Sequence, residues 1–416
     1  MSARLVETRP GEDTRPRESR FELTPRPLVY SGNRMRLLVN GEQYFPQLLA
    51  AIEASRRSIY LETYLFADDR IGQRVADALV AAAARGVSVR LVIDGFGGGE
   101  FARRLVTEIG THGVEAKIYR SERWWRLERK LLRRLHRKIA VIDEALAFVG
   151  GINIIDDLNF PDADDPKIGP RFDFAVACEG PIVAAVTLAA KRLWWTMSFV
   201  DPRATAGRLP LAERQPRPNA FPSGVAASLL LRDNLRNRRS IERAYLEAIN
   251  TACDDVLIAN AYFVPGRRLR TALRDATARG VRVRLLLQGR VEYAIHYYGQ
   301  QALYGTLLDA GVEIYEYLPS FLHAKVAVID GHWSTVGSSN IDPYSLLLAR
   351  EANLVVYDDG FAHEMSGVLD AAIVRDAYQV KPEDFRSRGA LVRAFNWFAY
   401  GLLRLATVVL ARGKDY

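Results

Sequence analysis

The chain contains the pattern His-x-Lys-x-x-x-x-Asp twice. The first copy, LHRKIAVID, supplies His136, Lys138 and Asp143, and the second, LHAKVAVID, supplies His323, Lys325 and Asp330. The offset is 187 residues in each case (323 − 136, 325 − 138, 330 − 143). A Gly-x-x-Asn follows each copy at the same distance and ends at Asn153 and Asn340. Two copies of one cationic, imidazole-bearing segment predict two similar halves that assemble one site.

Chance does not explain these copies. The chain has 6 His and 8 Lys against 49 Arg, so His-x-Lys should arise only about 0.1 times by composition. Most basic positions are Arg, yet both copies keep Lys, which is a compact point charge rather than a planar fork. We therefore interpret the doubled pattern as functional.

Length and charge define the class of protein. The 416 residues, 49% of them hydrophobic, are enough for two domains or halves, each with a core. The net charge of +8 favours an anionic partner, which could be a phospholipid surface, nucleic acid or a phosphorylated substrate. Cys178 and Cys253 can build neither a disulfide framework nor a metal site, and we expect both to be small core residues in a reducing compartment.

Self-similarity extends beyond the motifs. A helix end, a Gly turn and an apolar strand recur as ARGVSVRLVIDG (84–95) and ARGVRVRLLLQG (278–289). Strand-like segments precede them at 58–66 and 255–264, and helical segments lie between at 72–85 and 267–279. This alternation predicts an α/β fold in which each half is a mostly parallel sheet flanked by helices.

Composition also predicts the boundaries of the two halves and of the segments that flank them. We expect a polar tail at 1–27 without a secretory signal, a first half at 28–200, a Pro- and Arg-rich linker at 201–224 and a second half at 225–385. An amphipathic helix is expected at 386–416. No apolar stretch reaches the ~18 residues of a membrane-spanning helix.

Two amphipathic segments favour contact with a membrane surface. Residues 120–134, RSERWWRLERKLLRR, place an apolar face on a strongly basic segment, although a solvated basic helix and an RNA-binding segment are alternatives. In the C-terminal segment, Arg393, Asn396 and Arg404 share one helical face, and the large apolar residues lie away from it. Those polar groups disfavour spanning and favour a helix in the membrane plane, with ordinary packing as the alternative.

Strand geometry predicts how the motif residues are displayed. Residues two apart point to the same face of a strand, so His136 and Lys138 should project together, as should His323 and Lys325, while Arg137 points away. The motif aspartates lie an odd number of residues further on, and we expect them to support the site. Asn153 and Asn340 can return amide donors to the pocket.

This set of residues suits the chemistry of a phosphodiester. One neutral imidazole can attack phosphorus, and the other, protonated, can give its proton to the leaving oxygen. Lysine and amide donors stabilise the negative charge, so we expect no metal and no cofactor. Asp173 and Glu351 open corresponding strands after the two motifs and are candidates to orient the imidazoles, unless they are surface carboxylates at strand starts.

The doubled motif resembles the phospholipase D superfamily, and LHRKIAVIDEALAFVGGIN looks most like the bacterial cardiolipin synthases of the short type without N-terminal membrane spans. The resemblance covers about residues 30–380. It implies a two-lobed α/β/α protein with the site between the lobes and a phosphatidyl-histidine intermediate. It also implies that His136 is the nucleophile, that His323 is the acid and base, and that the motif lysines and asparagines hold phosphate.

The resemblance also places the motif aspartates, Asp143 and Asp330, in the catalytic motif as supporting residues. The two copies differ in one respect, because the first has Gly-Gly-Ile-Asn where the second has Gly-Ser-Ser-Asn. A phosphate contact from Ser338 or Ser339 is therefore expected on one side only, and this asymmetry leaves the choice of nucleophile open.

Three functions remain in view. The first is a phosphatidyltransferase that makes cardiolipin from phosphatidylglycerol, bound peripherally to the cytoplasmic face of the cytoplasmic membrane. The second is a hydrolase of the same superfamily, either a phospholipase D or a nuclease. The third is a non-catalytic membrane- or nucleic-acid-binding protein, which the intact His and Lys of both copies argue against. We expect anionic phospholipid as the partner, nucleic acid to be disfavoured, and no obligate protein partner.

Overall fold

The computed structural model describes residues 27–120, 134–160, 168–200, 221–233, 237–342, 349–386 and 389–411. Most of the expected tail and linker, and residues 121–133 of the basic segment, lie outside these residues. The elements of the first half are β1 (Val29–Val39), α1 (Asn40–Ala54), β2 (Ser58–Thr63), α2 (Arg70–Ala84), β3 (Ser88–Asp94), α3 (Gly99–Gly110), β4 (Glu115–Tyr119), β5 (Lys138–Ile142), β6 (Leu146–Gly150), β7 (Phe174–Glu179) and α4 (Ile182–Val200).

The second half repeats this order and then continues. Its elements are β8 (Val225–Arg232), α5 (Ser240–Thr251), β9 (Asp255–Asn260), α6 (Arg267–Ala278), β10 (Arg282–Gln288), α7 (Ala294–Gln301), α8 (Tyr304–Asp309), β11 (Glu313–Tyr317), β12 (Lys325–Ile329), β13 (Trp333–Gly337), β14 (Glu351–Tyr357), α9 (Asp359–Asp376), β15 (Ala377–Gln379), α10 (Pro382–Arg386) and α11 (Ala390–Ala411).

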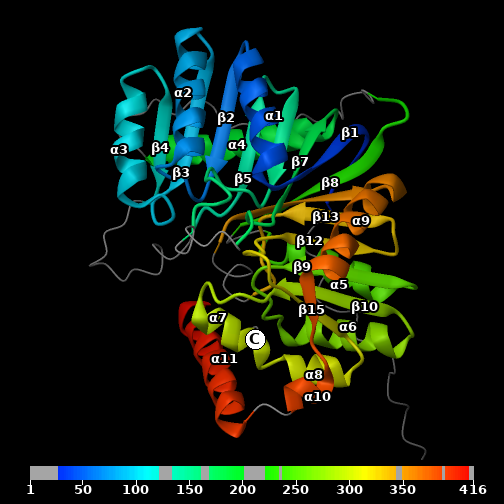
Figure 1. Cartoon of the computed structure of the whole chain (residues 1–416). Helices are drawn as coiled ribbons and strands as arrows, with labels where there is room; N and C mark the ends of the chain where they lie inside the picture. The colour runs from blue at the N-terminus through cyan, green and yellow to red at the C-terminus, as the bar shows by residue number, and fades with distance from the viewer. Residues whose placement is uncertain are drawn as a thin grey trace, which may run out of the picture.

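The strands of the described residues form one continuous sheet (Figure 1). Their order is β15-β11-β10-β9-β12-β13-β14-β8-β1-β7-β6-β5-β2-β3-β4. The halves meet where β1 pairs antiparallel with β8, and from this seam each half runs outward through equivalent strands. The prediction of two similar α/β halves is confirmed.

The prediction that each sheet is mostly parallel is wrong. In the first half the parallel pairs are β2–β3 and β3–β4, whereas β5 runs antiparallel to both β2 and β6, and β7 runs antiparallel to β6 and β1. The second half has the same pattern. The reason lies in the motif itself, because a turn at 143–145 joins β5 to β6 and a turn this short can only bring in an antiparallel neighbour.

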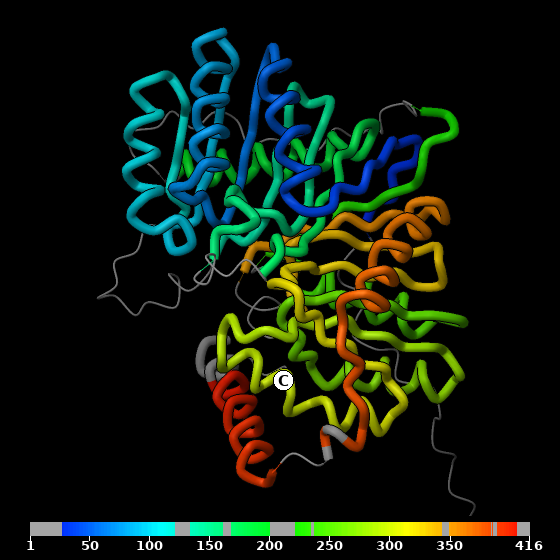
Figure 2. The backbone as a smooth tube through the Cα atoms, in the orientation of Figure 1, coloured from blue at the N-terminus to red at the C-terminus, as the bar shows by residue number. Residues whose placement is uncertain are grey.

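Helices cover both faces of the sheet (Figures 1 and 2). Alternate residues of β5 enter different cores, with Ile139 and Val141 on one side and Ala140 and Ile142 on the other. The first core lies under α4 and α9 and includes strand residues of both halves. The cores of the other face belong to single halves, under α1–α3 in one and α5, α6 and α8 in the other. One shared core therefore fixes the halves against each other.

The repeated helix–Gly–strand segments form as the pattern predicts. In α2, buried Val75, Leu79 and Ala82 recur at helical spacing. Gly86 (φ 87°) and Gly280 (φ 89°) follow the ends of α2 and α6 in the left-handed region, where glycine is favoured. The chain can therefore turn directly from each helix into β3 or β10.

The two cysteines differ in environment. Cys178 is buried as expected, but Cys253 is exposed, so its prediction as a core residue is wrong. Cys253 lies in the turn between α5 and β9, where its backbone N–H is bound by the Asp330 carboxylate at 2.9 Å. Within the described part of the chain, no helix combines the length and the apolar character that crossing a membrane requires.

Candidate active site

Backbone pairing between the halves positions both motif histidines. Leu135 forms a parallel bridge with Arg350, and Leu322 forms the equivalent bridge with Phe172. The His136 backbone N–H donates to the Arg350 carbonyl at 2.9 Å, and the His323 N–H donates to the Phe172 carbonyl at 2.8 Å. Each histidine is therefore anchored to the other half of the chain.

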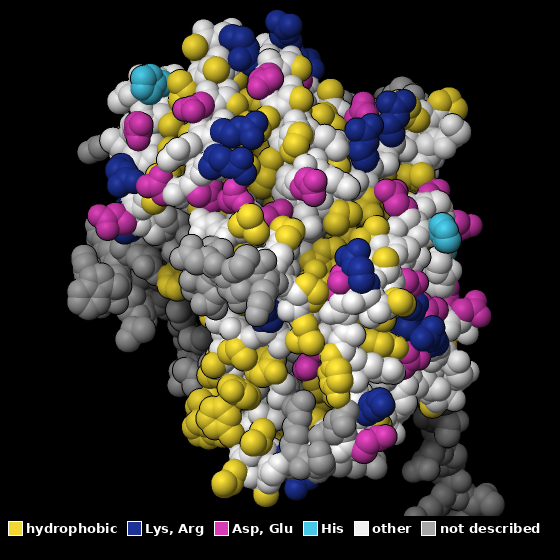
Figure 3. Space-filling model, viewed as in Figure 1, with side chains coloured by type: hydrophobic (Ala, Val, Ile, Leu, Met, Phe, Trp, Pro, Cys, Tyr) yellow, Lys and Arg dark blue, Asp and Glu magenta, His cyan; other side chains and the backbone are white. Residues whose placement is uncertain are grey.

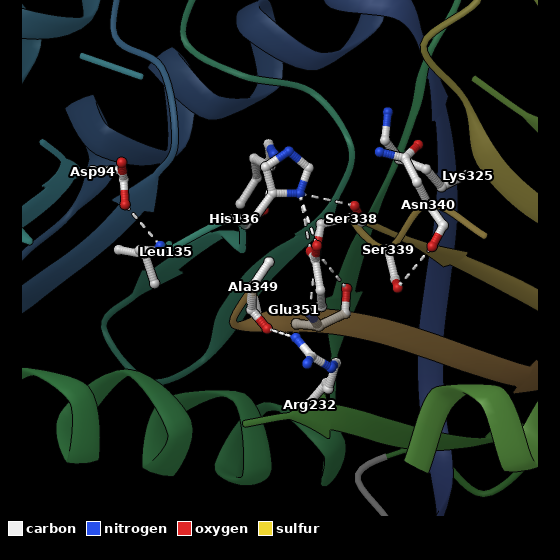
Figure 4. A network of polar contacts seen from close by, with 12 residues as sticks. Asp94, Leu135, His136, Arg232, Lys325, Ser338, Ser339, Asn340, Ala349 and Glu351 are labelled. Carbon is white, nitrogen blue, oxygen red and sulfur yellow. Dashed lines mark hydrogen bonds and ion pairs between the residues drawn. The ribbon is translucent and has the colours of Figure 1, made fainter. Parts of the chain in front are cut away.

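The imidazoles are paired with carboxylates across the same interface. His136 Nδ1 lies 3.0 Å from Glu351 Oε2, and His323 Nδ1 lies 2.6 Å from Asp173 Oδ2. Figure 4 shows the His136 ring directed at Glu351, with the Ser338 carbonyl also 3.1 Å from Nδ1. The candidates to orient the histidines thus contact them, and each comes from the half opposite its histidine.

Burial sets the protonation of the site. It lowers the pKa of His136, opposed by the Glu351 carboxylate, and lowers the pKa of His323 well below its usual value, assisted by Lys325 and Arg171. Both imidazoles are therefore neutral at pH 7. Since Nδ1–H donates to a carboxylate, each Nε2 keeps the lone pair that nucleophilic attack or proton capture requires.

The two lysines project with their histidines, as strand alternation predicts. Lys138 Nζ donates to the His136 carbonyl at 2.8 Å, and Lys325 Nζ donates to the His323 carbonyl. Arg137 points to the other face, where it pairs with buried Glu62 at 2.8 Å. Burial lowers the pKa of Lys138 to about 7 and that of Lys325 to about 8, although the nearby carboxylates oppose this.

The depressed lysine pKa values indicate the charge of the ligand that the site favours. Lys325 lowers the pKa of Lys138, and Arg171 lowers that of Lys325, so repulsion between positive charges opposes the protonation of both lysines. A bound anion would relieve this repulsion and restore the positive charge of both. Across the described residues, no three His, Cys, Asp or Glu side chains are grouped so that they could hold a metal ion. The arrangement suits a phosphate group.

The motif asparagines follow β6 and β13 in equivalent loops. Asn153 Oδ1 accepts the Leu65 backbone N–H at 3.2 Å, which leaves its NH₂ group to donate elsewhere. Asn340 is buried, and the loop that carries it is held by Asn260, whose Oδ1 accepts the Ile341 N–H at 3.1 Å. Asn260 pairs with Lys325 in the sheet, so this contact ties the Asn340 loop to the motif lysine.

Ser338 has a different role from the one predicted. Its hydroxyl donates to Glu351 Oε2 at 2.5 Å, so the phosphate contact expected for Ser338 is replaced by a contact that positions the carboxylate (Figure 4). In the first half Gly151 takes this place, and a Cβ there would lie 2.3 Å from Asp173 Oδ1. The shorter aspartate therefore requires glycine, while the longer glutamate leaves room for serine.

The motif aspartates lie away from the histidines. Asp143 follows the far end of β5, where its carboxylate accepts the backbone N–H groups of Arg56, Arg57 and Ser58 at 2.7–2.9 Å. Asp330 makes the same contacts with Cys253, Asp254 and Asp255. Their grouping with the catalytic residues is corrected, because they fix the turns that precede β2 and β9, as the odd spacing suggested.

Sequence reasoning missed four side chains near the histidines. Tyr64 packs edge-on against His136, with ring centroids 5.0 Å apart, and the centroid of its ring lies 5.4 Å from Lys138 Nζ. Tyr262, Arg171 and Glu292 form a hydrogen-bonded cluster near His323. Tyr64 and Tyr262 follow β2 and β9, the neighbours of the motif strands, and this adjacency could have identified them. Glu292 lies in a turn that is not part of the repeat, so no pattern marks it.

The model of the family described as "Cardiolipin synthase, PLD-like domain" matches residues 48–159 and 245–372. Each matched range carries one of the two histidine–lysine motifs. The chain belongs to this cardiolipin synthase family. The match therefore includes the residues that both halves contribute to the site.

Relatives agree over most of the chain. A cardiolipin synthase B of Salmonella typhimurium is 39% identical over 352 residues, covering 84% of this chain and 82% of the relative, and that of Escherichia coli K12 is 38% identical over the same length. A cardiolipin synthase A of Pseudomonas fluorescens is 31% identical over 358 residues, covering 86% of this chain and 71% of the relative.

Solved structures share the fold. The phosphatidylserine synthase of Haemophilus influenzae has a TM-score of 0.65 at 13% identity, covering 91% of this chain and 94% of that one. The polyphosphate kinase of Porphyromonas gingivalis has a TM-score of 0.56 at 12% identity, covering 90% of this chain and 53% of that one. At these identities the comparisons show the architecture alone.

Proposed function

We propose that the protein is a phosphatidyltransferase that moves a phosphatidyl group from phosphatidylglycerol to a second phosphatidylglycerol, which makes cardiolipin and releases glycerol. The observation that carries this proposal is the pair of imidazoles, each held by a buried carboxylate of the other half, beside two buried lysines. Family membership supplies the lipid substrate, because the relatives are named cardiolipin synthases.

In the first step, His136 Nε2 attacks phosphorus and a phosphatidyl-histidine forms. The bond from phosphorus to the glycerol oxygen breaks, and protonated His323 gives its proton to that oxygen. A negative phosphodiester next to the lysines favours this protonation, since it offsets the charges that lower the pKa of His323. Glu351 stabilises the positive charge that develops on His136.

In the second step, the acceptor alcohol enters where glycerol has left. His323 takes its proton, the alcohol oxygen attacks phosphorus, and the phosphorus–nitrogen bond to His136 breaks. Lys138, Lys325 and the amides of Asn153 and Asn340 hold the non-bridging oxygens through both steps. Because they are fixed before the substrate arrives, they stabilise the growing negative charge without reorganisation.

An exposed apolar surface supports attachment to a membrane. We define the apolar patch as Val291, Tyr293 and Ile295 together with Leu391, Val392, Phe395, Trp397, Phe398, Leu402 and Leu405 of α11, all of which are exposed. Figure 3 shows apolar side chains gathered in the region of α7 and α11. The opposite face of α11 is packed, because Asn396 and Ala399 are buried and the Tyr400 hydroxyl accepts a hydrogen bond from Arg270 at 2.9 Å.

The apolar patch continues to the site. Phe395 of α11 contacts Tyr298 of α7 with ring centroids 5.0 Å apart, and Tyr293 at the start of α7 contacts Tyr262 at 5.9 Å. Insertion of the patch into a lipid surface would therefore bring headgroups to His323. With a net charge of +8, the anionic cytoplasmic face of the cytoplasmic membrane is the surface we propose.

The test uses purified protein, phosphatidylglycerol vesicles and EDTA, with lipid products resolved by mass spectrometry. Cardiolipin and glycerol in equal amounts would support the proposal. Phosphatidic acid alone would identify a hydrolase, and the absence of any lipid product would redirect the search to nuclease activity. Acid quenching followed by peptide mapping would show which histidine carries the phosphatidyl group.

A further inference from the structure

A cluster of three side chains beside His323 has no counterpart in the first half. Lys325 pairs with Asn260 in the sheet, and the same register continued places Tyr262 opposite His323. The equivalent position in the first half, opposite His136, is Leu65. Glu292 lies in the turn after β10, whereas the corresponding turn after β3 reads Gly-Phe-Gly-Gly (95–98) and has no carboxylate. The site is therefore asymmetric on the His323 side.

Contacts place the Glu292 carboxylate next to that imidazole. Its Oε2 accepts the Tyr262 hydroxyl at 2.6 Å, and its Oε1 accepts from Arg171 at 3.3 Å. Arg171 precedes Asp173 by two residues in one extended segment, so the two side chains share a face. Asp173 holds His323 and Arg171 holds Glu292, and Glu292 and His323 each act on the pKa of the other, so Glu292 lies close to the same histidine.

Glu292 differs from the two orienting carboxylates in exposure and charge. Its side chain is 19% exposed, compared with 0% for Glu351 and 4% for Asp173, so a substrate can reach it. Burial works to raise the pKa of Glu292, but Arg171 and His323 outweigh burial and lower it. The carboxylate is thus ionised at neutral pH and retains lone pairs beyond those used by Tyr262 and Arg171.

We propose that Glu292 forms the subsite for the glycerol headgroup and accepts a hydrogen bond from the hydroxyl that neighbours the reacting one. This inference rests on the proposed phosphatidyl transfer. His323 would handle the proton of the reacting hydroxyl while Glu292 holds its neighbour. The departing glycerol and the incoming phosphatidylglycerol carry the same vicinal hydroxyls, so one subsite serves both steps.

Such a subsite explains how an alcohol is preferred over water. Water has no second hydroxyl, so it gains nothing from Glu292 when it attacks the phosphatidyl-histidine. A hydrogen bond to a charged, half-buried acceptor discriminates by roughly tenfold or more. Glu292 then determines the partition between transfer and hydrolysis, without forming or breaking a covalent bond itself.

The experiment compares two soluble acceptors in one reaction. Vesicles of phosphatidylglycerol are incubated with equal concentrations of deuterated glycerol and 1-propanol, and the labelled phosphatidylglycerol and phosphatidylpropanol are quantified by mass spectrometry. We expect the wild-type protein to favour glycerol and Glu292→Gln to lower the product ratio by about tenfold, with more phosphatidic acid. The KM for glycerol should rise more than kcat falls.

Glu313→Gln is the matched control. Glu313 is likewise held by an arginine and a tyrosine, Arg282 at 2.8 Å and Tyr315 at 2.7 Å, but it lies at the start of β11 away from the histidines. This variant should keep the wild-type ratio. If Glu292→Gln does not fold, Glu292→Asp keeps the charge and withdraws it by one methylene, and it should lower the ratio as well.

The outcomes separate the two proposals. A variant at Glu292 that slows all products equally, at an unchanged ratio, would show that the residue only joins the halves through Arg171 and would overturn the inference. A wild-type protein that transfers to no alcohol would instead overturn the proposed function. A wild-type protein that makes cardiolipin but does not discriminate between glycerol and 1-propanol would reject the subsite alone.

Discussion

Glu351 of the second half holds His136 of the first, with 3.0 Å between Oε2 and Nδ1, and Asp173 of the first half holds His323 of the second at 2.6 Å. The carboxylates fix the tautomer and direction of both imidazoles, and each can stabilise an imidazolium when it forms. The exchange of carboxylates means that the site exists only where the halves meet.

Removal of either carboxylate charge should slow the reaction. We expect Glu351→Gln and Asp173→Asn to reduce kcat by at least about tenfold, because the imidazoles lose the charge that stabilises their protonated form. Steady-state kinetics on phosphatidylglycerol vesicles would measure this. Asp359→Asn is the control, since Asp359 pairs at 2.6 Å with His332 on the surface. Unchanged turnover in both site variants would contradict the orienting role.

His136→Ala should abolish turnover and leave the fold intact. Loss of the nucleophile removes the covalent route, so we expect at least a ~10³-fold reduction. Circular dichroism and thermal unfolding would check the fold. His332→Ala, which removes an exposed histidine, should retain wild-type activity. Full activity of His136→Ala would end the two-histidine mechanism.

The glycine–serine asymmetry predicts losses of activity of different size for two small substitutions. Gly151→Ala should reduce activity more than about tenfold, because its Cβ would lie 2.3 Å from Asp173 Oδ1 and displace the partner of His323. Ser338→Ala loses one hydrogen bond to Glu351 and should cost less. Gly367→Ala on α9 has open space around the new methyl group and serves as the control. Equal activities for Gly151→Ala and Gly367→Ala would reject the steric argument.

The lysine pKa values predict how phosphate binding depends on pH. Lys138 and Lys325 have pKa values lowered to about 7 and about 8, so an empty site loses its positive charge as the pH rises. Competitive inhibition by inorganic phosphate should therefore weaken by about tenfold or more between pH 7 and pH 9. If the inhibition constant for phosphate does not change over this range, groups other than the two lysines hold the anion.

The same pKa values set the sign of a stability effect. Because the folded pKa values of the lysines lie below the unfolded value of 10.5, the unfolded chain binds more protons between about pH 7 and 10.5. The contribution of these two groups to the free energy of unfolding thus rises with pH across that window. Lys138→Met should flatten this rise in thermal unfolding experiments, and an identical pH profile would contradict the assignment.

The apolar patch can be tested without removing α11, whose other face is packed. We expect Phe398→Ser with Leu402→Ser to weaken binding to anionic vesicles by about tenfold or more, since both side chains are exposed and each loses buried apolar area at the lipid surface. Val374→Ser on α9, at a side chain that is 87% exposed, is the matched control. Co-sedimentation would measure binding, and equal binding by all variants would reject the interfacial helix.

Repetition made much of the architecture predictable. The 187-residue offset, the paired helix–Gly–strand segments and the alternation of His136 and Lys138 with Arg137 all follow from local periodicity, and the structure has them as expected. Strand direction could not be predicted in this way. A short hairpin turn reverses the chain after the motif strand and makes the next strand antiparallel, whereas the βαβ pattern predicts a parallel strand. Composition predicts Cys253 to be a core residue, but a short turn exposes it.

The site was predictable where a motif carried it. Asp173 and Glu351 could be chosen as candidates because they open equivalent strands, but the crossed pairing depends on how the halves meet, which no local pattern encodes. The position of Ser338 after its motif predicts a phosphate contact, whereas its contact with Glu351 depends on the pairing of β13 with β14, which the sequence does not encode locally. Glu292 stands outside the repeat, so only its neighbours reveal it.

Because each carboxylate contacts the histidine of the other half, a mutation in one half can change the catalytic residues of the other. A change from Asp173 to glutamate would alter the surroundings of a histidine 150 residues further along the chain, and it would do so against a backbone that leaves no room for a side chain at Gly151. Glycine with aspartate and serine with glutamate are therefore matched pairs that must be inherited together. Each matched pair lies within one half, so a chimaera assembled from halves of different relatives keeps both pairs, and its activity depends on whether each carboxylate still reaches the histidine of the other half.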